Sequence, residues 1–204
     1  MFLKDTYNKI AEDWHKDHES DTWWISGTNK FISFLKKGDL VLDVGCAGGR
    51  KSKYLIEHGL RVVGVDISEK FIEIAKKEVL EGEFHVLGLE DLDKLEPIFD
   101  DIFMQAVLLH LPKKEVWPNF KKAVTKLKTG GYLYVAVKEK YPNGPEEEIK
   151  DENDYGYSYQ RFFSYFTLDE ILDYFHQAGL EVIFSNVSPI GKTNWIEVIG
   201  KSIK

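Results

Sequence analysis

The order of apolar runs along the middle of the chain constrains the fold more than any other feature. Short β-rich runs alternate with longer amphipathic stretches between residues 40 and 138, a pattern typical of a parallel sheet flanked by helices. Runs such as LVLDV and RVVGVD are almost continuously apolar, as expected of strands buried on both faces. The predicted strands are Leu40–Val44, Arg61–Asp66, Glu83–Leu87, Asp101–Ala106 and Tyr132–Lys138, and the predicted helices lie near Arg50–Glu57, Glu69–Leu80 and Lys113–Lys128.

The C-terminal part of the chain extends this pattern. In TLDEILDYFHQAGL, Thr167 can cap a helix, Glu170 sits at the reciprocal position of a capping box, and Gly179 marks the end of the helix. The runs Glu181–Val187 and Asn194–Gly200 flank the turn Ser-Pro-Ile-Gly-Lys and predict an antiparallel pair at the sheet edge. We therefore expect an α/β fold with a seven-stranded, mostly parallel sheet, an antiparallel edge hairpin and helices on both faces.

Helical spacing also precedes the first strand. Tyr7, Ile10, Ala11 and Trp14 fall on one face of a helix. A second short helix or turn around Trp23 follows it. These segments predict a helical N-terminal cap on the sheet rather than a separate domain.

Composition limits the classes of function. The 204 residues, 43% of them apolar and 30% charged, suit one globular domain. A formal net charge of −7 opposes binding to a polyanion, because Lys and Arg supply most of that affinity. Cys46 is the only cysteine, so no disulfide can form within the chain. The N-terminal residues do not resemble a signal peptide, and the longest apolar run, Ile102–Leu109, is far shorter than the ~20 residues of a membrane span. We expect a cytoplasmic protein with no membrane partner.

A glycine-rich loop lies between the first predicted strand and helix. In LVLDVGCAGGR, the strand ends at Gly45, and the helix begins after Gly49. Glycine permits a sharp turn and close approach to a ligand, and the amide groups of a helix N-terminus favour an anionic group. A strand–helix turn that merely needs glycine is the simpler interpretation of this loop alone.

An acidic residue at the end of the second strand favours a ligand. Asp66 lies about twenty residues beyond the loop, where a carboxylate can accept hydrogen bonds from both hydroxyls of a ribose. Ser68 is available to cap the next helix, which leaves Asp66 for a ligand. Together, the loop and Asp66 predict a nucleoside-containing cofactor.

The charge pattern of the loop selects among such cofactors. A dinucleotide loop reads GxGxxG and holds a pyrophosphate, whereas this loop has Asp43 two residues before Gly45. A carboxylate repels a pyrophosphate but attracts an ammonium or sulfonium group. S-adenosyl-L-methionine carries both cations, so the pattern favours it over NAD. An NAD-dependent oxidoreductase is a weaker alternative.

The same segments resemble a known family, the class I S-adenosylmethionine-dependent methyltransferases, whose sheet is Rossmann-like. VLDVGCAGG is similar to the first motif of that family, and GVDIS to the acidic segment after its second strand. FDDIFMQAVLLHLP, LKTGGYLYVAV and YFTLDEILDYFHQAGLEVI resemble its later segments in the correct order, so that the resemblance spans roughly Tyr7 to Ile199. The cofactor site that it implies holds S-adenosyl-L-methionine, or its product S-adenosyl-L-homocysteine, against Asp43, Gly45, Cys46, Gly48, Asp66 and Ile67.

One position departs from the family pattern. Gly88 stands where the family often has an acidic residue that binds the adenine amino group. Adenine recognition is then expected from backbone groups near Leu89 and Glu90, or from the Glu90 side chain. The resemblance implies a single methyltransferase domain over residues 1–204. It comprises a cap (1–37), a cofactor-binding core (38–138), an insertion over the acceptor site (139–166), and a C-terminal helix with edge strands (167–204).

Candidate residues for the acceptor side lie at the ends of later strands. Ligands of such sheets bind outside the carboxyl ends of the strands, which places Gln105 and His110 near the transferred methyl group. His110 is a candidate general base because imidazole titrates near neutrality, although packing on its neighbours is the simpler interpretation. Lys138 and Arg161 either bind an acidic acceptor or the methionine carboxylate, or are solvated charges. Tyr7 and Trp14 are expected to lie over the cofactor if the first helix folds down as a lid.

The insertion is rich in charged and aromatic residues. Residues 141–159 show no clear period and predict a functional or mobile loop, with Glu146–Glu148 as a solvated face. Aromatic walls suit a planar or apolar acceptor and attract a sulfonium, whereas core packing explains Phe163 and Phe166 equally well. The aromatic cluster comprises Tyr155, Tyr157, Tyr159, Phe162, Phe163, Tyr165 and Phe166.

These observations predict methyl transfer to an oxygen, nitrogen or similar nucleophile of a small-molecule acceptor. No metal is expected, nucleic acid is disfavoured as a partner, and the chain is expected to be a monomer or homodimer. A catalytically silent protein that binds S-adenosylmethionine or another nucleoside, and an RNA methyltransferase, are the alternatives.

Overall fold

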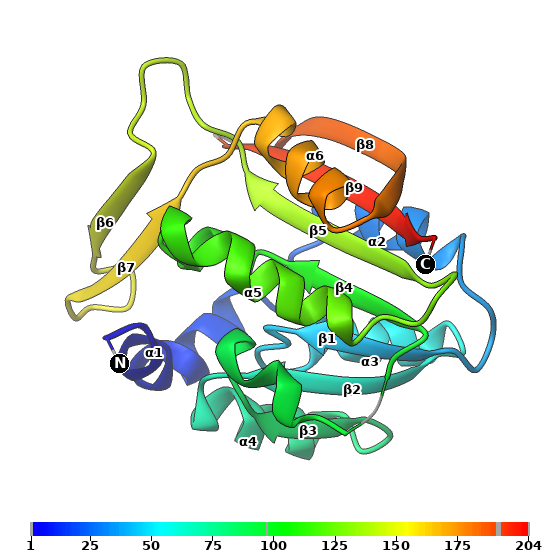
Figure 1. Ribbon diagram of the computed structural model, residues 1–204. Helices are drawn as coiled ribbons and strands as arrows, with labels where there is room; N and C mark the ends of the chain where they lie inside the picture. The colour runs from blue at the N-terminus through cyan, green and yellow to red at the C-terminus, as the bar shows by residue number, and fades with distance from the viewer. Residues whose placement is uncertain (1, 97, 191–192, 204) are drawn as a thin grey trace.

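The computed structural model describes residues 2–96, 98–190 and 193–203. Its main sheet has seven strands in the order β3-β2-β1-β4-β5-β9-β8 (Figure 1). The strands of this sheet are β1 (Leu40–Val44), β2 (Arg61–Asp66), β3 (Glu83–Val86), β4 (Asp101–Gln105), β5 (Tyr132–Lys138), β8 (Leu180–Ile190) and β9 (Thr193–Ser202). The predicted fold class is confirmed.

The pairing of the strands explains why the sequence pattern predicted the sheet. β1 pairs in parallel with β2 and with β4, and β5 pairs in parallel with β4. β9 lies antiparallel between β5 and β8. The parallel strands β1, β2, β4 and β5 are buried on both faces, so their side chains are mostly apolar. The edge strand β3 is partly exposed. The antiparallel pair is at the edge, as predicted.

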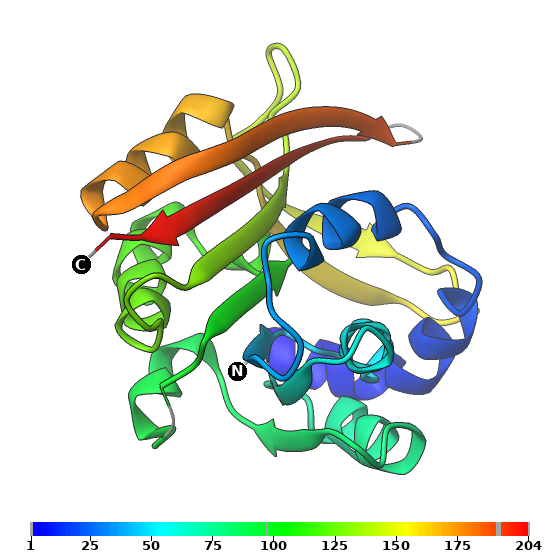
Figure 2. The same cartoon turned by 90° about the vertical axis from the view of Figure 1, so that its right-hand side faces the viewer.

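Helices cover both faces of the sheet. In Figure 2, helices α5 and α6, green and orange, lie on one side, and the blue helix α2 and the yellow hairpin lie on the other. The helices are α1 (Phe2–Asp17), α2 (Ile25–Ile32), α3 (Arg50–Glu57), α4 (Glu69–Glu78), α5 (Lys113–Thr125) and α6 (Leu168–Gln177), with the short 3₁₀ turns η1 (Leu89–Lys94) and η2 (Leu108–His110). Each predicted helix is present.

Two predicted caps are confirmed at the hydrogen-bond level. The Ser68 hydroxyl accepts a hydrogen bond from the Phe71 amide at the start of α4. Thr167 and Glu170 form a reciprocal capping box at the start of α6. Gly179 follows α6 with φ of +73°, a left-handed conformation that glycine adopts without steric cost.

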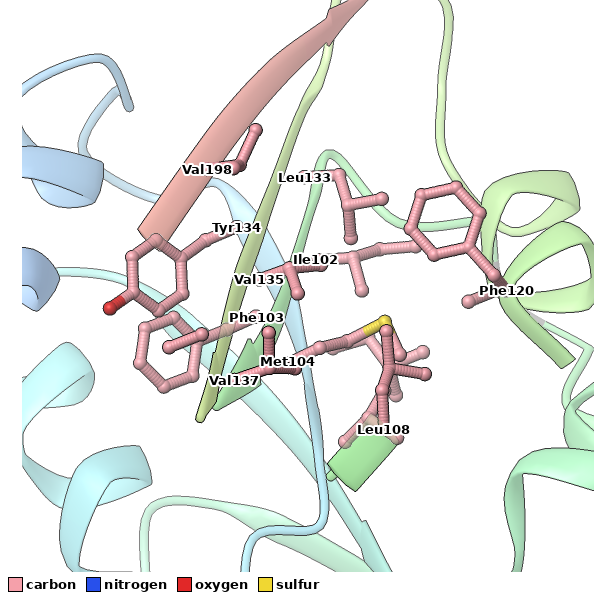
Figure 3. Close-up of a cluster of buried hydrophobic side chains, with 14 of the residues drawn as sticks. Ile102, Phe103, Met104, Leu108, Phe120, Leu133, Tyr134, Val135, Val137 and Val198 are labelled. Carbon is pink, nitrogen blue, oxygen red and sulfur yellow. The ribbon is translucent and has the colours of Figure 1, made fainter. Parts of the chain in front are cut away.

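The core lies on both sides of the central strands. Figure 3 shows Phe103 and Tyr134 on one side of β4 and β5, with Ile102, Leu133 and Phe120 on the other. Phe103 and Tyr134 stack at a centroid distance of 4.8 Å, and all five side chains are fully buried. This packing holds the carboxyl ends of β4 and β5 rigidly beside the end of β1.

The prediction of a loop over residues 141–159 was wrong in part. Residues Glu147–Glu152 form strand β6, which pairs antiparallel with β7 (Tyr159–Ser164) in a separate two-stranded sheet. The run EEIKDE has no apolar alternation because ion pairs, rather than a buried apolar face, hold its inward side. Glu152 pairs with Arg161, and Glu148 pairs with Lys150. The expected solvated face is therefore partly turned inward.

The last predicted turn was displaced. Ser188, Pro189 and Ile190 belong to β8 rather than to a turn, because β8 and β9 stay paired up to Ile190 and Thr193. The remaining predicted turn positions, 191 and 192, lie outside the described residues. Within the described ranges, no helix is long and apolar enough to span a membrane.

Candidate active site

A large cavity opens at the carboxyl ends of β1, β2, β4 and β5, with a volume of about 930 Å³. Every candidate residue of the sequence analysis except Asp43 borders it. Those residues are Tyr7, Trp14, Gly45, Cys46, Gly48, Asp66, Ile67, Leu89, Glu90, Gln105, His110, Lys138 and Arg161. The parallel topology explains this convergence, because the carboxyl ends of neighbouring parallel strands meet at one edge.

The glycine loop adopts a backbone that larger residues resist. Gly45 has φ of +70°, and a Cβ there would lie 2.5 Å from Cγ2 of Val107. Ala47 follows at φ of +47° and Ala106 at +61°. Left-handed alanines are uncommon, and such strained positions concentrate at ligand sites. The loop is shaped for close backbone approach rather than for a simple turn.

Asp66 is held at the cavity rim by two backbone donors. Its carboxylate accepts hydrogen bonds from the Ala47 amide at 3.0 Å and from the Ser68 amide at 2.9 Å. Each carboxylate oxygen keeps a lone pair for a further donor. Burial raises the pKa of Asp66 to about 6, against the lowering effect of these amide hydrogen bonds. Asp66 is therefore ionised at neutral pH and aimed by the loop and by the start of α4.

Asp43 lies beneath the loop instead of on the cavity surface. It is 2% exposed, and the Ser52 hydroxyl donates a hydrogen bond to its Oδ2 at 2.6 Å. Burial raises the pKa of Asp43 to about 6, while the charge of Lys51 lowers it. Lys51 itself borders the cavity, so Asp43 faces a lysine there. Direct contact between Asp43 and a cofactor stays a prediction.

Cys46 and Gly48 have packing roles in addition to their place at the cavity. The Cys46 thiol is buried with side chains of α4 and with Phe84, and burial raises its pKa well above the ordinary range. A Cβ on Gly48 would lie 2.2 Å from Nδ1 of His15. A side chain at this position would have to displace the His15 ring of α1.

The first helix closes the cavity from above through His110. The Tyr7 hydroxyl donates a hydrogen bond to Nε2 of His110 at 2.7 Å, and Nδ1 of His110 donates to the Phe162 carbonyl at 2.9 Å. Because a carbonyl only accepts, the imidazole is the Nδ1–H tautomer. Burial lowers the pKa of His110 to about 3, helped by the charge of Arg161. His110 is thus neutral, and its basic nitrogen already accepts a hydrogen bond.

The lid position expected for α1 agrees with this geometry. Trp14 packs edge-on against Phe71 at 5.4 Å and stacks on His18 at 4.1 Å. The side chain of Asn8 hydrogen-bonds to Ser68 and to Glu69, which fastens α1 to the start of α4. Tyr7 and Trp14 both border the cavity from this helix.

Lys138 and Arg161 differ in their partners. Arg161 makes two hydrogen bonds to the Glu152 carboxylate, at 2.5 and 2.7 Å. Lys138 extends from the end of β5, with its ammonium 4.2 Å from the Phe163 ring centre. Among the described residues, no carboxylate lies within ion-pair distance of Lys138. Burial and the charge of Arg161 lower the pKa of Lys138 to about 8.

The far end of the cavity is apolar. Ile67, Phe71 and Leu89 line it together with Glu90. The Glu90 carboxylate folds back over Gly88, where a Cβ would lie 2.4 Å from Oε2. Gly88 therefore makes room for an acidic side chain two residues later, at the turn where the resembling family carries its own acidic residue.

The aromatic cluster of the insertion divides into three groups. Phe162 and Phe163 border the cavity. Tyr165 and Phe166 are core residues with at most 1% exposure. Tyr157 packs on α1, where its hydroxyl donates to Asp13 at 2.6 Å. Only part of the cluster can therefore contact an acceptor.

Sequence reasoning missed several residues that border the cavity. Trp23 and Trp195 stack at a centroid distance of 4.4 Å and border the cavity. Trp195 comes from β9, far along the chain, and no local pattern distinguishes it from an edge-strand core residue. Asp21, which also borders the cavity, lies in an irregular segment with no motif.

Comparison with known proteins agrees with this geometry. Residues 41–131 match the family described as "Methyltransferase domain". This stretch of the chain is similar to a methyltransferase domain. The matched stretch includes the glycine loop and Asp66, and it ends where β5 begins.

Curated relatives match part of the chain. The chain is 36% identical over 105 residues to a ubiquinone biosynthesis O-methyltransferase of Coxiella burnetii, an alignment that covers 50% of this chain and 44% of the relative. A ubiquinone biosynthesis O-methyltransferase of Chromobacterium violaceum is 28% identical over 145 residues, covering 65% of this chain and 61% of the relative. The chain thus spans less than half the length of the Coxiella relative.

Solved structures share the whole fold. A Burkholderia thailandensis 1,6-didemethyltoxoflavin-N1-methyltransferase, solved with 1,6-didemethyltoxoflavin and S-adenosylhomocysteine, matches 100% of this chain and 88% of its own with a TM-score of 0.78 at 18% identity. The magnesium protoporphyrin IX methyltransferase of Synechocystis, solved with S-adenosylhomocysteine, has a TM-score of 0.74 at 18% identity, covering 98% and 97% of the two chains. At this identity the likeness establishes the fold alone.

Proposed function

We propose that this chain is an enzyme that transfers a methyl group from S-adenosyl-L-methionine to an oxygen, nitrogen or similar nucleophile of a small molecule. The observation that carries the proposal is the ionised Asp66, aimed by backbone amides into the cavity that the glycine loop also lines. A volume of about 930 Å³ is within the range of small-ligand sites. The methyltransferase domain and the ligands of the structural neighbours support the same assignment.

The residues at the cavity match the chemistry of this cofactor. Asp66 would accept hydrogen bonds from the ribose hydroxyls, and Ile67, Phe71 and Leu89 would enclose the adenine. The backbone of Gly45 offers close approach without a Cβ. Asp21 is the carboxylate available on the cavity surface for the cofactor's ammonium group, near Lys51 and the start of α3.

Catalysis then depends mainly on alignment. When bound, S-adenosyl-L-methionine supplies a methyl group that its sulfonium has already activated. The residues of this chain position the acceptor at the ends of β4 and β5, and α1 excludes water above them. Good alignment of two reactants contributes up to ~7–11 kcal/mol to a rate, so a strong base is not required for an acceptor that attacks in its deprotonated or neutral form.

The Tyr7–His110 pair positions the lid rather than removing a proton. Nε2 of His110 accepts a hydrogen bond from the Tyr7 hydroxyl. Burial raises the pKa of Tyr7 to about 12. Both groups are therefore neutral near pH 7. We propose that they hold α1 closed over the acceptor.

The proposal is tested by calorimetric titration of the protein with S-adenosylhomocysteine, S-adenosylmethionine and NAD. Saturable binding of both adenosyl compounds, with no uptake of NAD, is the expected result. Release of S-adenosylhomocysteine with a panel of aromatic and heterocyclic acceptors then measures turnover. Absence of adenosyl binding would overturn the proposal, and tight binding without turnover on any acceptor would favour a silent binding protein.

A further inference from the structure

Lys138 borders the cavity and has no carboxylate at ion-pair distance among the residues that the structure describes. Near Lys138, the other two cations each have a carboxylate: Arg161 pairs with Glu152 at 2.5 Å, and Lys150 pairs with Glu148 at 3.2 Å. The charges around the Lys138 ammonium thus leave one positive charge uncompensated at the cavity wall.

A buried amide lies beside this cation on the same face of the sheet. Gln105 is 3% exposed and borders the cavity, and in the described part of the chain neither its side-chain nitrogen nor its oxygen has a hydrogen-bond partner. The neighbouring Tyr134 hydroxyl donates a hydrogen bond to the Glu197 carboxylate. An unsatisfied buried amide is costly unless a ligand completes it.

Aromatic rings border the space around both groups. Trp23 stacks on Trp195, which β9 places opposite Lys138 in the sheet register. The Lys138 ammonium lies 4.2 Å from the centre of the Phe163 ring and 6.0 Å from the centre of the Trp195 ring. Flat apolar walls of this kind favour a planar ligand.

The sheet sets the distance between the backbone positions of the two residues. Gln105 pairs with Ala136 on β5, so Lys138 lies one strand across and two residues along. With ~4.8 Å between strands and ~3.3 Å per residue, this separation is roughly 8 Å between backbone positions. One aromatic ring with polar groups at opposite ends can bridge it.

We infer that the acceptor is an aromatic acid whose single anionic group pairs with Lys138 while its ring lies between the Trp23–Trp195 stack and Phe163. This inference rests on the proposed methyl transfer. A carboxylate fits better than a phosphate, because one uncompensated cation matches one negative charge. The side-chain amide of Gln105 then forms a hydrogen bond with the polar group at the other end of the ring, near the end of β1.

The sheet order argues against the methionine carboxylate as the partner of Lys138. Asp66 ends β2, and Lys138 ends β5, three strands away in the order β2-β1-β4-β5, which is roughly 14 Å at ~4.8 Å per strand. The glycine loop joins β1 to α3, on the β2 side of β4. A cofactor held by Asp66 and this loop leaves Lys138 to the acceptor.

The test is calorimetric binding of aromatic acids to protein already saturated with S-adenosylhomocysteine. The probes are para-hydroxybenzoate and a hydroxynaphthoate, each compared with its neutral carboxamide. We expect at least one acid to bind about tenfold or more tightly than its amide, as a charge-assisted hydrogen bond predicts. Lys138→Gln should remove that preference, and Lys138→Arg should keep it. The control Lys140→Gln should not alter it, because Lys140 pairs with Glu146 and is not among the residues that border the cavity.

Three outcomes would overturn the inference. The first is that no acid binds more tightly than its amide in the native protein. The second is that Lys138→Gln retains the preference, and the third is that Lys138→Gln weakens S-adenosylhomocysteine instead, which would place the cofactor carboxylate at Lys138. Failure of S-adenosylhomocysteine to bind the native protein would instead contradict the proposed function, so the two failures are distinguishable.

Discussion

Replacing Asp66 by asparagine tests the cofactor site most directly. The carboxylate accepts the Ala47 and Ser68 amides and would accept two ribose hydroxyls. Asparagine keeps the shape but removes the charge, and its NH₂ group cannot accept. Hydrogen bonds to a charged group contribute ~1.5–3 kcal/mol each, against ~0.5–1.5 kcal/mol for neutral pairs. The loss over two hydroxyls is then about 2–3 kcal/mol, or roughly 30- to 150-fold in affinity.

The Asp66→Asn substitution should affect the thermal stability of the protein differently from its affinity for the cofactor. The pKa of Asp66 is raised to about 6 in the folded chain, so keeping it ionised at pH 7 costs about 3 kcal/mol relative to the unfolded chain. Asparagine avoids that cost but leaves one backbone amide without its acceptor, at about 1–3 kcal/mol. The two effects nearly cancel, so we expect the thermal midpoint of the ligand-free Asp66→Asn protein to stay close to that of the native protein.

Calorimetry with S-adenosylhomocysteine across pH separates these effects. Protonation of Asp66 in the free protein should lower native affinity below pH 6, by up to about tenfold per pH unit. Asp43 titrates near the same pH in both proteins, so the Asp66 contribution is the difference between their pH profiles. The exposed Asp173→Asn variant is the matched control. Native affinity in Asp66→Asn, with an unchanged pH profile, would refute the ribose assignment.

Three further variants test the lid, the loop and a cap. Tyr7→Phe leaves Nε2 of His110 without its donor, which should lower stability by about 1–3 kcal/mol in thermal and denaturant unfolding; the double variant with His110→Phe should recover part of the loss, and additive losses would contradict the pairing. Gly45→Ala forces φ of +70° on an L-residue and places a Cβ against Val107. We therefore expect the free energy of unfolding to fall by about 2–4 kcal/mol and S-adenosylhomocysteine to bind more weakly. Native stability together with native affinity would contradict this prediction. Thr167→Ala should cost about 1 kcal/mol through the lost cap of α6, measured by denaturant unfolding, without affecting cofactor affinity.

The helix and strand predictions held wherever short-range physics decides the structure. Apolar runs buried on both faces mark β1, β2, β4 and β5, and Ser68 and Thr167 mark helix starts through hydrogen bonds to residues three positions away. β6 escaped prediction because its stability comes from pairing with β7 and from ion pairs such as Glu152–Arg161. Such partners are distant in the chain, so no local period records them.

The candidate site likewise has a part that local sequence predicted and a part that tertiary contacts decided. The glycine loop and Asp66 were readable because a strand–turn–helix unit positions them within one stretch of chain. Whether a candidate side chain is free was decided by tertiary contacts. Nε2 of His110 accepts a hydrogen bond from Tyr7, 103 residues away. Arg161 is neutralised by Glu152, whereas Lys138 has no carboxylate at ion-pair distance in the part of the chain that the structure describes.

The amino-acid sequence by itself determined the order of the elements, the parallel sheet and the place where a nucleoside could bind, because these follow from burial patterns and backbone conformations over a few residues. Only the tertiary structure decided which charges are compensated and which rings border the cavity. Trp23, Trp195 and Gln105 come from three separate segments, and their shared cavity exists only once β9 has paired with β5. Chemistry that depends on pairing between distant segments is a property of the folded chain.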